Sequence, residues 1–437
     1  MLWLLWSSCL ENLIRKSLVL IRPLDKGIDA RIGKPYLGFA IVGLGASIAP
    51  LDFAVNLAFP AMTEAFALPT ADIRWVAVFY VITYGSLMLY CGALGDRLGH
   101  LRVFRWGLFI SALGMAACAL SPAYGWLLAG RVLQGIGVAL TLSCAPALAM
   151  SLLAFEQRTL ALSAYGAMIA AAGLMAPLLG GISMLYWGWA GVYGFRVPIV
   201  LLALLCTPVL SSRLRLQKLS TPDATQPGSV QGLLQLMRRN ANFAWINLES
   251  VVVQFCSFTI ALSLPYALPA AGWREIASGA MLSLWALGVL GGSGVAPLLL
   301  RHMNLQAVGN LAQGLMALGL ALIGALSMAQ AWPLMALALL LQGLGLGVFQ
   351  VVYADKVVAT LSDSARGLSG SLTLVTRTVG IVAAALIWLW LMELLQNQAI
   401  SQGASKNEAI WAGTIGLLPW AAGIAIVLAA LSFWRRA

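Results

Sequence analysis

Four ionisable residues interrupt stretches of this chain that are otherwise apolar. Asp52 and Glu249 are acids, and Arg131 and Arg377 are cations. A charge inside a bilayer costs about 2.5–3.5 kcal/mol on insertion scales, so residues of this kind usually mark a function. Desolvation favours the neutral form of a carboxyl group, which lets an acid in a membrane cavity bind a proton on one side and release it on the other. The predicted chemistry is therefore reversible binding of protons or of a charged small molecule.

Each of these residues also has a structural interpretation, which the sequence leaves open. Asp52 could cap a helix end and tie neighbouring helices together, and Glu249 could turn its carboxylate towards water at the membrane interface. Arg131 could hold backbone carbonyl groups, or it could fix a positive charge beside a carboxyl group. Arg377 could play that second role from a later segment, or it could pair with an acid.

The composition identifies a membrane as the solvent for most of the chain. Of 437 residues, 61% are hydrophobic and 9% are charged, whereas soluble domains carry about 25% charged residues. The net charge of +11 does not predict nucleic-acid binding, because the charges lie at the ends of apolar runs rather than in one patch. His100 and His302 fall in short loops and the six cysteines lack metal-ligand spacing, so neither a metal nor a cofactor is expected.

Apolar runs bounded by charged or turn residues predict twelve spans. They should be helices, because a bilayer offers backbone polar groups no partner outside the segment. The predicted spans are 36–60, 73–93, 103–121, 124–147, 160–184, 193–212, 241–264, 276–300, 306–326, 332–354, 369–395 and 408–433.

The spans fall into two predicted bundles, residues 36–212 and residues 241–434. A polar stretch at 213–240 that contains STPDATQPGS is expected to be a cytoplasmic linker between them. Residues 1–35 are expected to form a cytoplasmic segment, with an amphipathic helix in the membrane plane as one possibility.

The two halves look like copies of one unit. VLQGIG (132–137) matches LLQGLG (340–345) at an offset of 208, and Arg158 falls on Arg366 at the same offset. Parallel six-helix repeats around a site near the membrane midplane are a transporter architecture. On this alignment the spans that carry Asp52 and Glu249 are opposite each other, so the two acids are expected to face one cavity.

Lysine and arginine counts predict the orientation of the chain. With both termini in the cytoplasm, 20 of these residues lie inside and 4 lie outside, the outer ones being Arg74, Arg196, Arg274 and Lys406. This excess follows the positive-inside rule. The predicted location is the inner (plasma) membrane, with several passes and both termini cytoplasmic.

Four short motifs resemble those of the major facilitator superfamily, over essentially the whole chain from residue 36. The loop CGALGDRLGHLR resembles the family's G-x-L-x-D-R-x-G signature, and GRVLQG resembles the fourth-helix R-x-x-Q-G motif. AGLMAPLLGG is similar to the fifth-helix antiporter motif, with Ala172 and Ala176 in place of two glycines. LDFAVN is similar to the first-helix L-D-x-T-I-V-N motif of the drug:proton antiporters, with Asp52 as its acid.

The resemblance implies an all-α membrane protein of twelve transmembrane helices in two six-helix bundles related by a parallel repeat. It also implies proton-coupled export of small amphipathic or cationic compounds, of the multidrug efflux type, by alternating access. The expected partners of the monomer are protons, a small-molecule substrate and the bilayer. The alternative is proton-coupled uptake of a sugar, organic acid or other small metabolite. A membrane-bound enzyme is not expected, because neither a nucleophile–base set nor an acidic metal cluster is visible.

The resemblance and the residue types also imply roles for three groups of side chains. A conformational latch is expected to dock across the seam between the bundles and stabilise the outward-open state; it comprises Gly92, Asp96, Arg97, Gly99 and Arg102. The antiporter motif contributes Pro177, Gly180 and Gly181. Weaker candidates for lining a cavity, since aromatic faces can hold lipophilic cations, are Asn56, Phe53, Tyr80, Tyr84, Gln134, Phe255 and Trp285.

Overall fold

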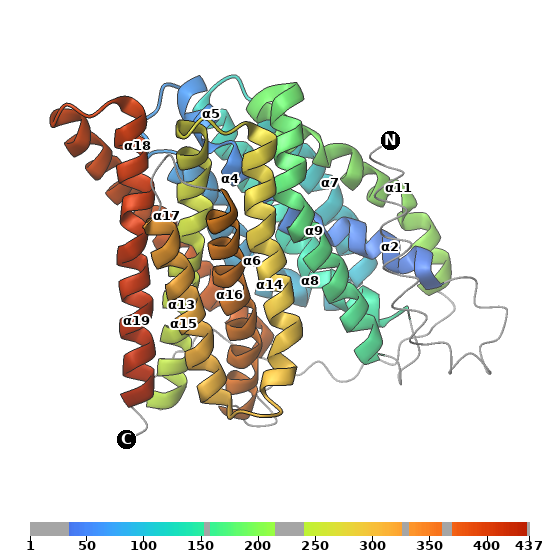
Figure 1. Cartoon of the computed structure of the whole chain (residues 1–437). Helices are drawn as coiled ribbons and strands as arrows, with labels where there is room; N and C mark the ends of the chain where they lie inside the picture. The colour runs from blue at the N-terminus through green and yellow to red at the C-terminus, as the bar shows by residue number, and fades with distance from the viewer. Residues whose placement is uncertain (1–34, 153–157, 215–239, 326–331, 361–368, 435–437) are drawn as a thin grey trace.

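The computed structural model describes residues 35–152, 158–214, 240–325, 332–360 and 369–434. Within these ranges the chain consists of helices and their connections, and they contain no strand. The first-half helices, blue to green, lie beside the second-half helices, yellow to red (Figure 1). The predicted segment 1–35 and the predicted linker fall almost entirely outside the described residues, so their boundaries stay predictions.

The first bundle contains six membrane-crossing units, two of which are broken into shorter pieces. The first unit is made of α2 (Pro35–Ala46), α3 (Ile48–Leu51), α4 (Ala54–Leu57) and α5 (Phe59–Ala65). Four long helices follow, α6 (Arg74–Leu98), α7 (His100–Ala119), α8 (Tyr124–Met150) and α9 (Arg158–Trp187). A short turn, η3 (Gly188–Ala190), leads into the sixth unit, α10 (Gly191–Gly194) and α11 (Arg196–Leu214).

The second bundle repeats this number of units with longer helices. It contains α13 (Ala241–Ala270), α14 (Glu275–Leu299), α15 (Leu305–Gly324), α16 (Trp332–Thr360) and α17 (Ser369–Ser401). The last unit is α18 (Lys406–Thr414), η5 (Ile415–Leu417) and α19 (Leu418–Trp434).

Ten helical stretches of the described chain are long and apolar enough to cross a membrane. An eleventh is the bent α6, whose two parts meet at 50°, and the shorter apolar helix Arg196–Leu210 occupies the remaining predicted span. The predicted all-α fold with two six-helix bundles is confirmed. The sequence-based spans differ from the helices mainly in length, because several helices continue beyond the apolar run into polar residues.

Glycines at matching positions of α8 and α16 show why the two halves pack alike. A Cβ added to Gly135 would lie 2.8 Å from Thr83 of α6, and the equivalent Gly343 meets the backbone of α14 at Trp285. Gly137 faces α7 in the same way that Gly345 faces α15. Small residues let membrane helices approach closely, so the predicted repeat corresponds to a shared pattern of helix contacts.

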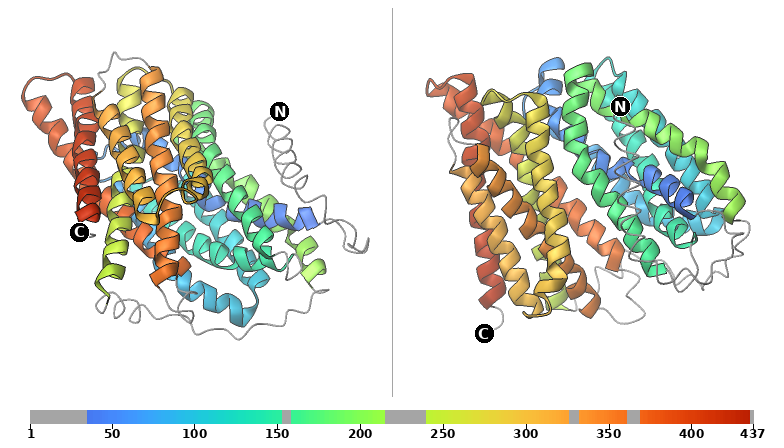
Figure 2. Two further views of the ribbon diagram at one scale, coloured as in Figure 1. Left: turned by 60° about the horizontal axis from the view of Figure 1, so that its bottom comes forward. Right: turned by 45° about the vertical axis from the view of Figure 1, so that its right-hand side comes forward.

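The bundles are joined at one end of the molecule. Three hydrogen bonds connect them within the described ranges, and all lie at the end that carries the α5–α6 connection, which is the predicted outer end. They are Thr63–Tyr266 (2.9 Å), Ala71–Glu393 (2.5 Å) and Thr70–Gln396 (3.3 Å). Away from this end the first-bundle helices run at an angle to those of the second bundle (Figure 2). The structure therefore represents a state closed at the predicted outer end.

Candidate functional site

Asp52 lies at a break in the first membrane-crossing unit. α3 ends at Leu51 and α4 begins at Ala54, and Pro50 just before the break has no amide hydrogen to donate. The amide nitrogens of Asp52 and Phe53 bond to carbonyl oxygens three residues back, at 3.1 and 3.2 Å. This tighter winding over the break is typical of 3₁₀ geometry. It sets two consecutive side chains, those of Asp52 and Phe53, in different surroundings.

The carboxylate of Asp52 is held by three side chains of its own bundle. Arg131 donates two parallel hydrogen bonds, from Nη1 to Oδ1 at 2.7 Å and from Nη2 to Oδ2 at 2.8 Å. Gln134 Nε2 donates to Oδ1 at 2.9 Å, and Gln134 Oε1 accepts from Arg131 Nη1 at 2.8 Å. Two-point pairing between a guanidinium and a carboxylate is the strong form of this interaction. The structure thus brings together three predicted site residues, two of them one helical turn apart on α8.

Arg196 is the third partner of Asp52, a contact that the sequence did not predict. Its Nη1 lies 2.6 Å from Asp52 Oδ1 and its side chain is fully buried. The sequence assigns Arg196 only to the outer side, near the start of the predicted span 193–212. In the structure it opens α11 with its guanidinium turned into the bundle, where Nε donates to the carbonyl oxygen of Val192 at 2.9 Å. A counter-ion 144 residues away in the chain stabilises this position.

Two tyrosines complete the surroundings of the charges. The Tyr80 ring lies 4.1 Å from the Arg131 guanidinium, and Tyr193 contacts both guanidiniums at 5.8 and 5.4 Å. The Arg131 Nε also donates to the carbonyl oxygen of Val76 at 2.8 Å. Asp52 and its two arginines form the cluster that we call the Asp52 cluster; it carries one formal negative and two positive charges. Arg196 Nη2 and Tyr80 Oη have no hydrogen-bond partner among the described residues.

Phe53, the neighbour of Asp52, contacts the other bundle. Its ring stacks on Trp285 of α14, with centroids 5.1 Å apart and planes at 21°. The Trp285 indole donates to Gln342 Oε1, and Gln342 Nε2 donates to Ser257 at 2.9 Å. Gln342 is the repeat equivalent of Gln134. One glutamine therefore supports a buried carboxylate, and its counterpart supports an aromatic contact between the bundles.

The antiporter motif lies where α9 of the first bundle crosses α14 of the second. A Cβ added to Gly181 would stand 2.5 Å from the carbonyl oxygen of Glu275, and one added to Gly180 would stand 2.9 Å from Ala54. Across the same contact, Gly279 of α14 approaches the carbonyl group of Pro177. The motif's glycines are therefore needed for close packing, both between the bundles and against the first unit.

Glu249 belongs to a second ion pair, which lies within the other bundle. Its Oε2 is 3.0 Å from the Lys356 ammonium group, and Oε1 accepts from Ser432 and from Trp245 Nε1, the latter at 3.2 Å. Both members of the pair are buried. All of these partners come from α13, α16 and α19, so the structure does not bring Glu249 and Asp52 to one shared site. The predicted roles of both acids in proton or substrate binding stay predictions.

Arg377 lies at the seam between the bundles, on the inward side of α17. Val375 and Val379 are exposed on one face of this helix, whereas Ile381 packs with Tyr80 and Val138 of the first bundle. Residues four apart share a helix face, so Arg377 shares the face of Ile381. Its side chain is exposed, and Tyr84 of α6 is close enough to interact with it electrostatically.

The remaining predicted cavity residues occupy several environments. Tyr84 lies beside Tyr80, with ring centroids 5.1 Å apart, and Phe255 makes an edge contact with Trp388 at 6.3 Å inside the second bundle. Asn56 is buried on α4. The structure therefore gathers Asn56, Phe53, Tyr80, Tyr84, Gln134 and Trp285 on the helices around the Asp52 cluster and the seam, and it leaves Phe255 on the second-bundle side.

Asp96 of the predicted latch loop contacts a residue of its own bundle. Its Oδ1 lies 3.5 Å from His100 Nε2, and its side chain is 57% exposed. Gly99, which has a φ of 91°, allows the sharp turn between α6 and α7. This turn brings His100, the first residue of α7, beside Asp96 near the end of α6. Within the described residues the loop has no hydrogen bond or ion pair to the second bundle, so its role as a latch stays a prediction.

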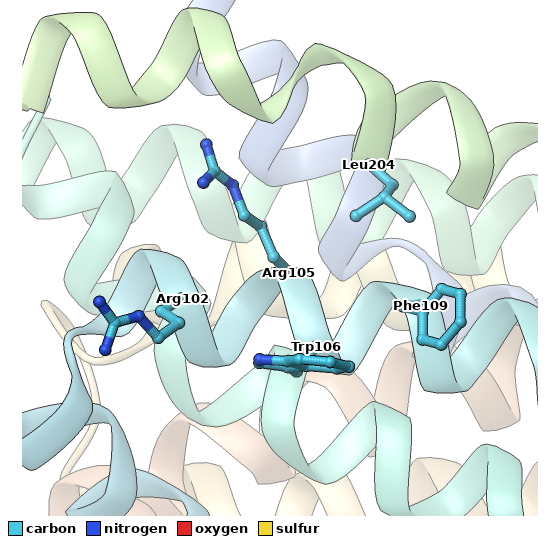
Figure 3. Close-up of a pocket in the computed structure, with 5 residues that line it drawn as sticks. All are labelled: Arg102, Arg105, Trp106, Phe109 and Leu204. Carbon is cyan, nitrogen blue, oxygen red and sulfur yellow. The ribbon is translucent and has the colours of Figure 1, made fainter.

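A shallow hollow on the outer flank of the first bundle lies away from this site (Figure 3). It lies between α7 and α11 and is lined by Arg102, Arg105, Trp106, Phe109 and Leu204. Arg105 is fixed by Thr207, from Nε to Oγ1 at 2.9 Å and from Nη2 to the carbonyl oxygen at 3.1 Å. The exposed apolar side chains of the hollow, Trp106 and Phe109, suit contact with lipid.

The family of the chain follows from its match to known proteins. The model of the Major Facilitator Superfamily matches residues 36–385. The chain belongs to this superfamily. It is thus a multi-pass membrane protein of a transporter family whose members act on small molecules, as the motifs predicted.

Relatives of the chain are mostly similar over part of its length. The methylenomycin A resistance protein of Bacillus subtilis is 33% identical over 175 residues, which cover 40% of this chain and 38% of that protein. The riboflavin transporter RibZ of Clostridioides difficile is 26% identical over 164 residues, 37% and 36% of the two chains. An uncharacterized transporter of Escherichia coli, YebQ, is 25% identical over 80% of this chain and 89% of its own length. The chain spans little more than a third of the first two relatives.

Solved superfamily structures share the fold. A bacterial homolog of the human lysosomal transporter Spinster has a TM-score of 0.74 at 15% identity, with 92% of this chain and 97% of that chain covered. The nucleoside transporter NupG has a TM-score of 0.73 at 13% identity, with 92% and 99% covered. These likenesses concern the arrangement of helices alone.

Proposed function

We propose that the protein is a proton-coupled exporter of small amphipathic compounds that works by alternating access. The observation that carries the proposal is the placement of two adjacent residues on the break in the first unit. Asp52 binds the cations of the first bundle, while Phe53 stacks across the seam on Trp285. A movement of Phe53 at the seam would thus act directly on the backbone of the adjacent buried acid, Asp52.

The proposed cycle uses this connection. When the bundles rock apart at the predicted outer end, the Phe53–Trp285 stack must separate, and the backbone at the break can move. Such movement can take Asp52 away from one arginine and open a position for a proton on the carboxylate. In the present state Arg131, Gln134 and Arg196 all donate to it. Alternating access of this kind is the rocking of one rigid repeat against the other.

Two further features support export. The chain keeps the proline and two of the glycines of the antiporter motif, and these glycines lie at a close crossing between the bundles. Several partial relatives bear names of resistance or export, including the tetracenomycin C resistance and export protein of Streptomyces glaucescens, 28% identical over 43% of this chain. The proposed location is the inner membrane with both termini in the cytoplasm.

The test has two stages, because the compound must be found before its flux can be measured. An efflux-deficient bacterial host carrying the gene would be screened against dyes, quaternary ammonium compounds and antibiotics for gain of resistance. The strongest hit would then be followed in proteoliposomes under an imposed pH gradient. We expect the gradient to drive the compound against the proton flow. A flux that is indifferent to the gradient would reject proton coupling, and gradient-driven movement in the direction of the protons would identify the uptake alternative.

A further inference from the structure

The buried charged side chains of the described chain are Arg131, Arg196, Lys356, Asp52 and Glu249. Asp52 is shared by the two arginines, and Glu249 is taken by Lys356. Both buried acids are therefore occupied by cations of their own bundle. A charged residue in a membrane protein that lacks such a partner usually faces a water-filled space or a ligand.

Arg377 is the cation best placed for such a partner. It forms no ion pair with an acid in the described part of the chain, and it is exposed on the face of α17 that is turned to the first bundle. By contrast, Arg131 and Arg196 are buried and bound to Asp52. Of the acids, Asp52 and Glu249 are paired with cations, and Glu393 at the outer end of the seam accepts from the Ala71 amide.

Aromatic side chains adjoin Arg377 and connect it with the Asp52 cluster. The backbone of α6 and α17 is close here, because a Cβ added to Gly85 would lie 2.9 Å from Thr378, and this brings the neighbouring Tyr84 and Arg377 together. Tyr80 packs 5.1 Å from Tyr84, and the Tyr80 ring lies over the Arg131 guanidinium. Phe258 packs in the same apolar group as these tyrosines. Such surroundings offer a flat apolar body a place to bind beside a guanidinium, and a guanidinium recognises a carboxylate through two parallel hydrogen bonds.

We propose that the substrate carries an anionic group, such as a carboxylate on an aromatic body, which binds Arg377 and the Tyr84 hydroxyl at the seam. This inference rests on the proposed transport function and narrows its substrate class. It departs from the cationic compounds that the antiporter resemblance implies, because Asp52 and Glu249, the two acids predicted to receive a cation, are already paired. Asp52 is left free for the proton, while Arg377 serves the substrate.

Three probes of one ring system test this inference on the full-length protein in nanodiscs. Naphthoate is anionic, naphthamide is neutral and naphthylmethylammonium is cationic, and empty nanodiscs correct for partitioning into lipid. Binding would be measured by calorimetry and by the rise in melting temperature. We expect naphthoate to bind most tightly, and Arg377→Gln to lose about tenfold or more in affinity, the worth of one strong charge-assisted contact. Arg377→Lys keeps the charge and should retain part of the binding.

Arg274→Gln is the matched control, because it removes one exposed positive charge at the predicted outer end, whereas Arg377 lies towards the opposite, predicted inner end of its helix. It should bind naphthoate as the wild type does. Tyr84→Phe, which removes only a hydroxyl group, gives a second measurement if Arg377→Gln does not fold, and it should weaken naphthoate binding alone. Equal binding of the three probes, or naphthoate binding that survives in both Arg377→Gln and Tyr84→Phe, would overturn the inference. Gradient-driven export of another compound would still stand in that case, which separates this failure from a failure of the transport proposal.

Discussion

The carbonyl oxygen of Glu275 occupies the space beside Gly181 that any larger residue would need. A Cβ at this position would lie 2.5 Å from that oxygen, which is closer than atoms of this kind approach. The two residues belong to different bundles, so this single contact reports on how closely α9 and α14 can cross. The importance of this motif glycine can therefore be measured by replacing it.

Gly181→Ala is expected to disfavour the state described here. The added methyl group meets backbone, which cannot rotate away, and overpacking of this kind costs about 1–3 kcal/mol. Transport should fall and cysteine pairs placed across the outer end should crosslink less readily. Gly166→Ala on the same helix is the matched control, because open space surrounds that position. Equal behaviour of the two variants would show that the crossing is not this tight.

Asp52→Asn should remove both coupling and stability. Without the carboxylate, Arg131 and Arg196 become two buried cations with no counter-ion, and breaking a buried pair in this way costs about 3–5 kcal/mol. We expect a lower melting temperature and no pH-driven flux. Glu64→Gln, at an exposed position, serves as the control.

The double variant Asp52→Asn/Arg196→Gln separates the two effects. It removes one positive charge along with the acid, so the melting temperature should recover part of the loss while pH-driven flux stays absent. If flux returned in this variant, Asp52 would not be the proton site. If stability did not recover, the pair between Asp52 and Arg196 would be energetically unimportant.

Phe53→Ala should uncouple the two bundles without disturbing the charges. Losing the stack on Trp285 removes about 0.5–1.5 kcal/mol of pair energy in addition to buried area. The state closed at the outer end should become less populated, as seen by accessibility of introduced cysteines on α5 and α13. Phe109→Ala, on the lipid-facing flank, should leave that accessibility unchanged. An unchanged population in Phe53→Ala would mean that the stack does not hold the seam.

The Glu249–Lys356 pair is expected to be structural. Glu249→Gln or Lys356→Met alone leaves one buried charge unpaired and should lower the melting temperature clearly, whereas the double variant should be closer to the wild type. pH-driven flux per folded molecule should persist in the double variant. Loss of flux in a double variant that folds normally would restore Glu249 as a proton or substrate group.

The sequence predicted the helices better than it predicted the charges between them. Twelve apolar runs, the repeat of VLQGIG in LLQGLG and the four motifs sufficed for the fold, because hydrophobicity and glycine spacing are local properties. The contact of Gln134 with Arg131 was also within reach, since residues three apart on a helix are neighbours. The contact of Asp96 with His100 has another origin, because the turn at Gly99 separates the two residues onto different helices.

Arg196 and Lys356 could not be assigned from the sequence. Each lies at the edge of an apolar run, where a charge normally belongs to a loop, and each was counted in the orientation estimate. Their partners lie 144 and 107 residues away, and no local pattern links them. Only the packing of the helices shows that both side chains turn inwards. Arg377 shows the converse, because its place inside a span was evident but the direction of its side chain was not.

The interactions within each bundle differ in kind from those between the bundles. Every ion pair that the structure describes joins residues of the same bundle, whereas the two bundles are held together by apolar side-chain packing, a ring stack, close-packed glycines and three hydrogen bonds. Relative movement of the two bundles therefore breaks no described ion pair and separates no opposite charges in the apolar interior. The contacts that it does break are short-range. A change in charge pairing can then come only from a proton or a bound solute acting within one bundle.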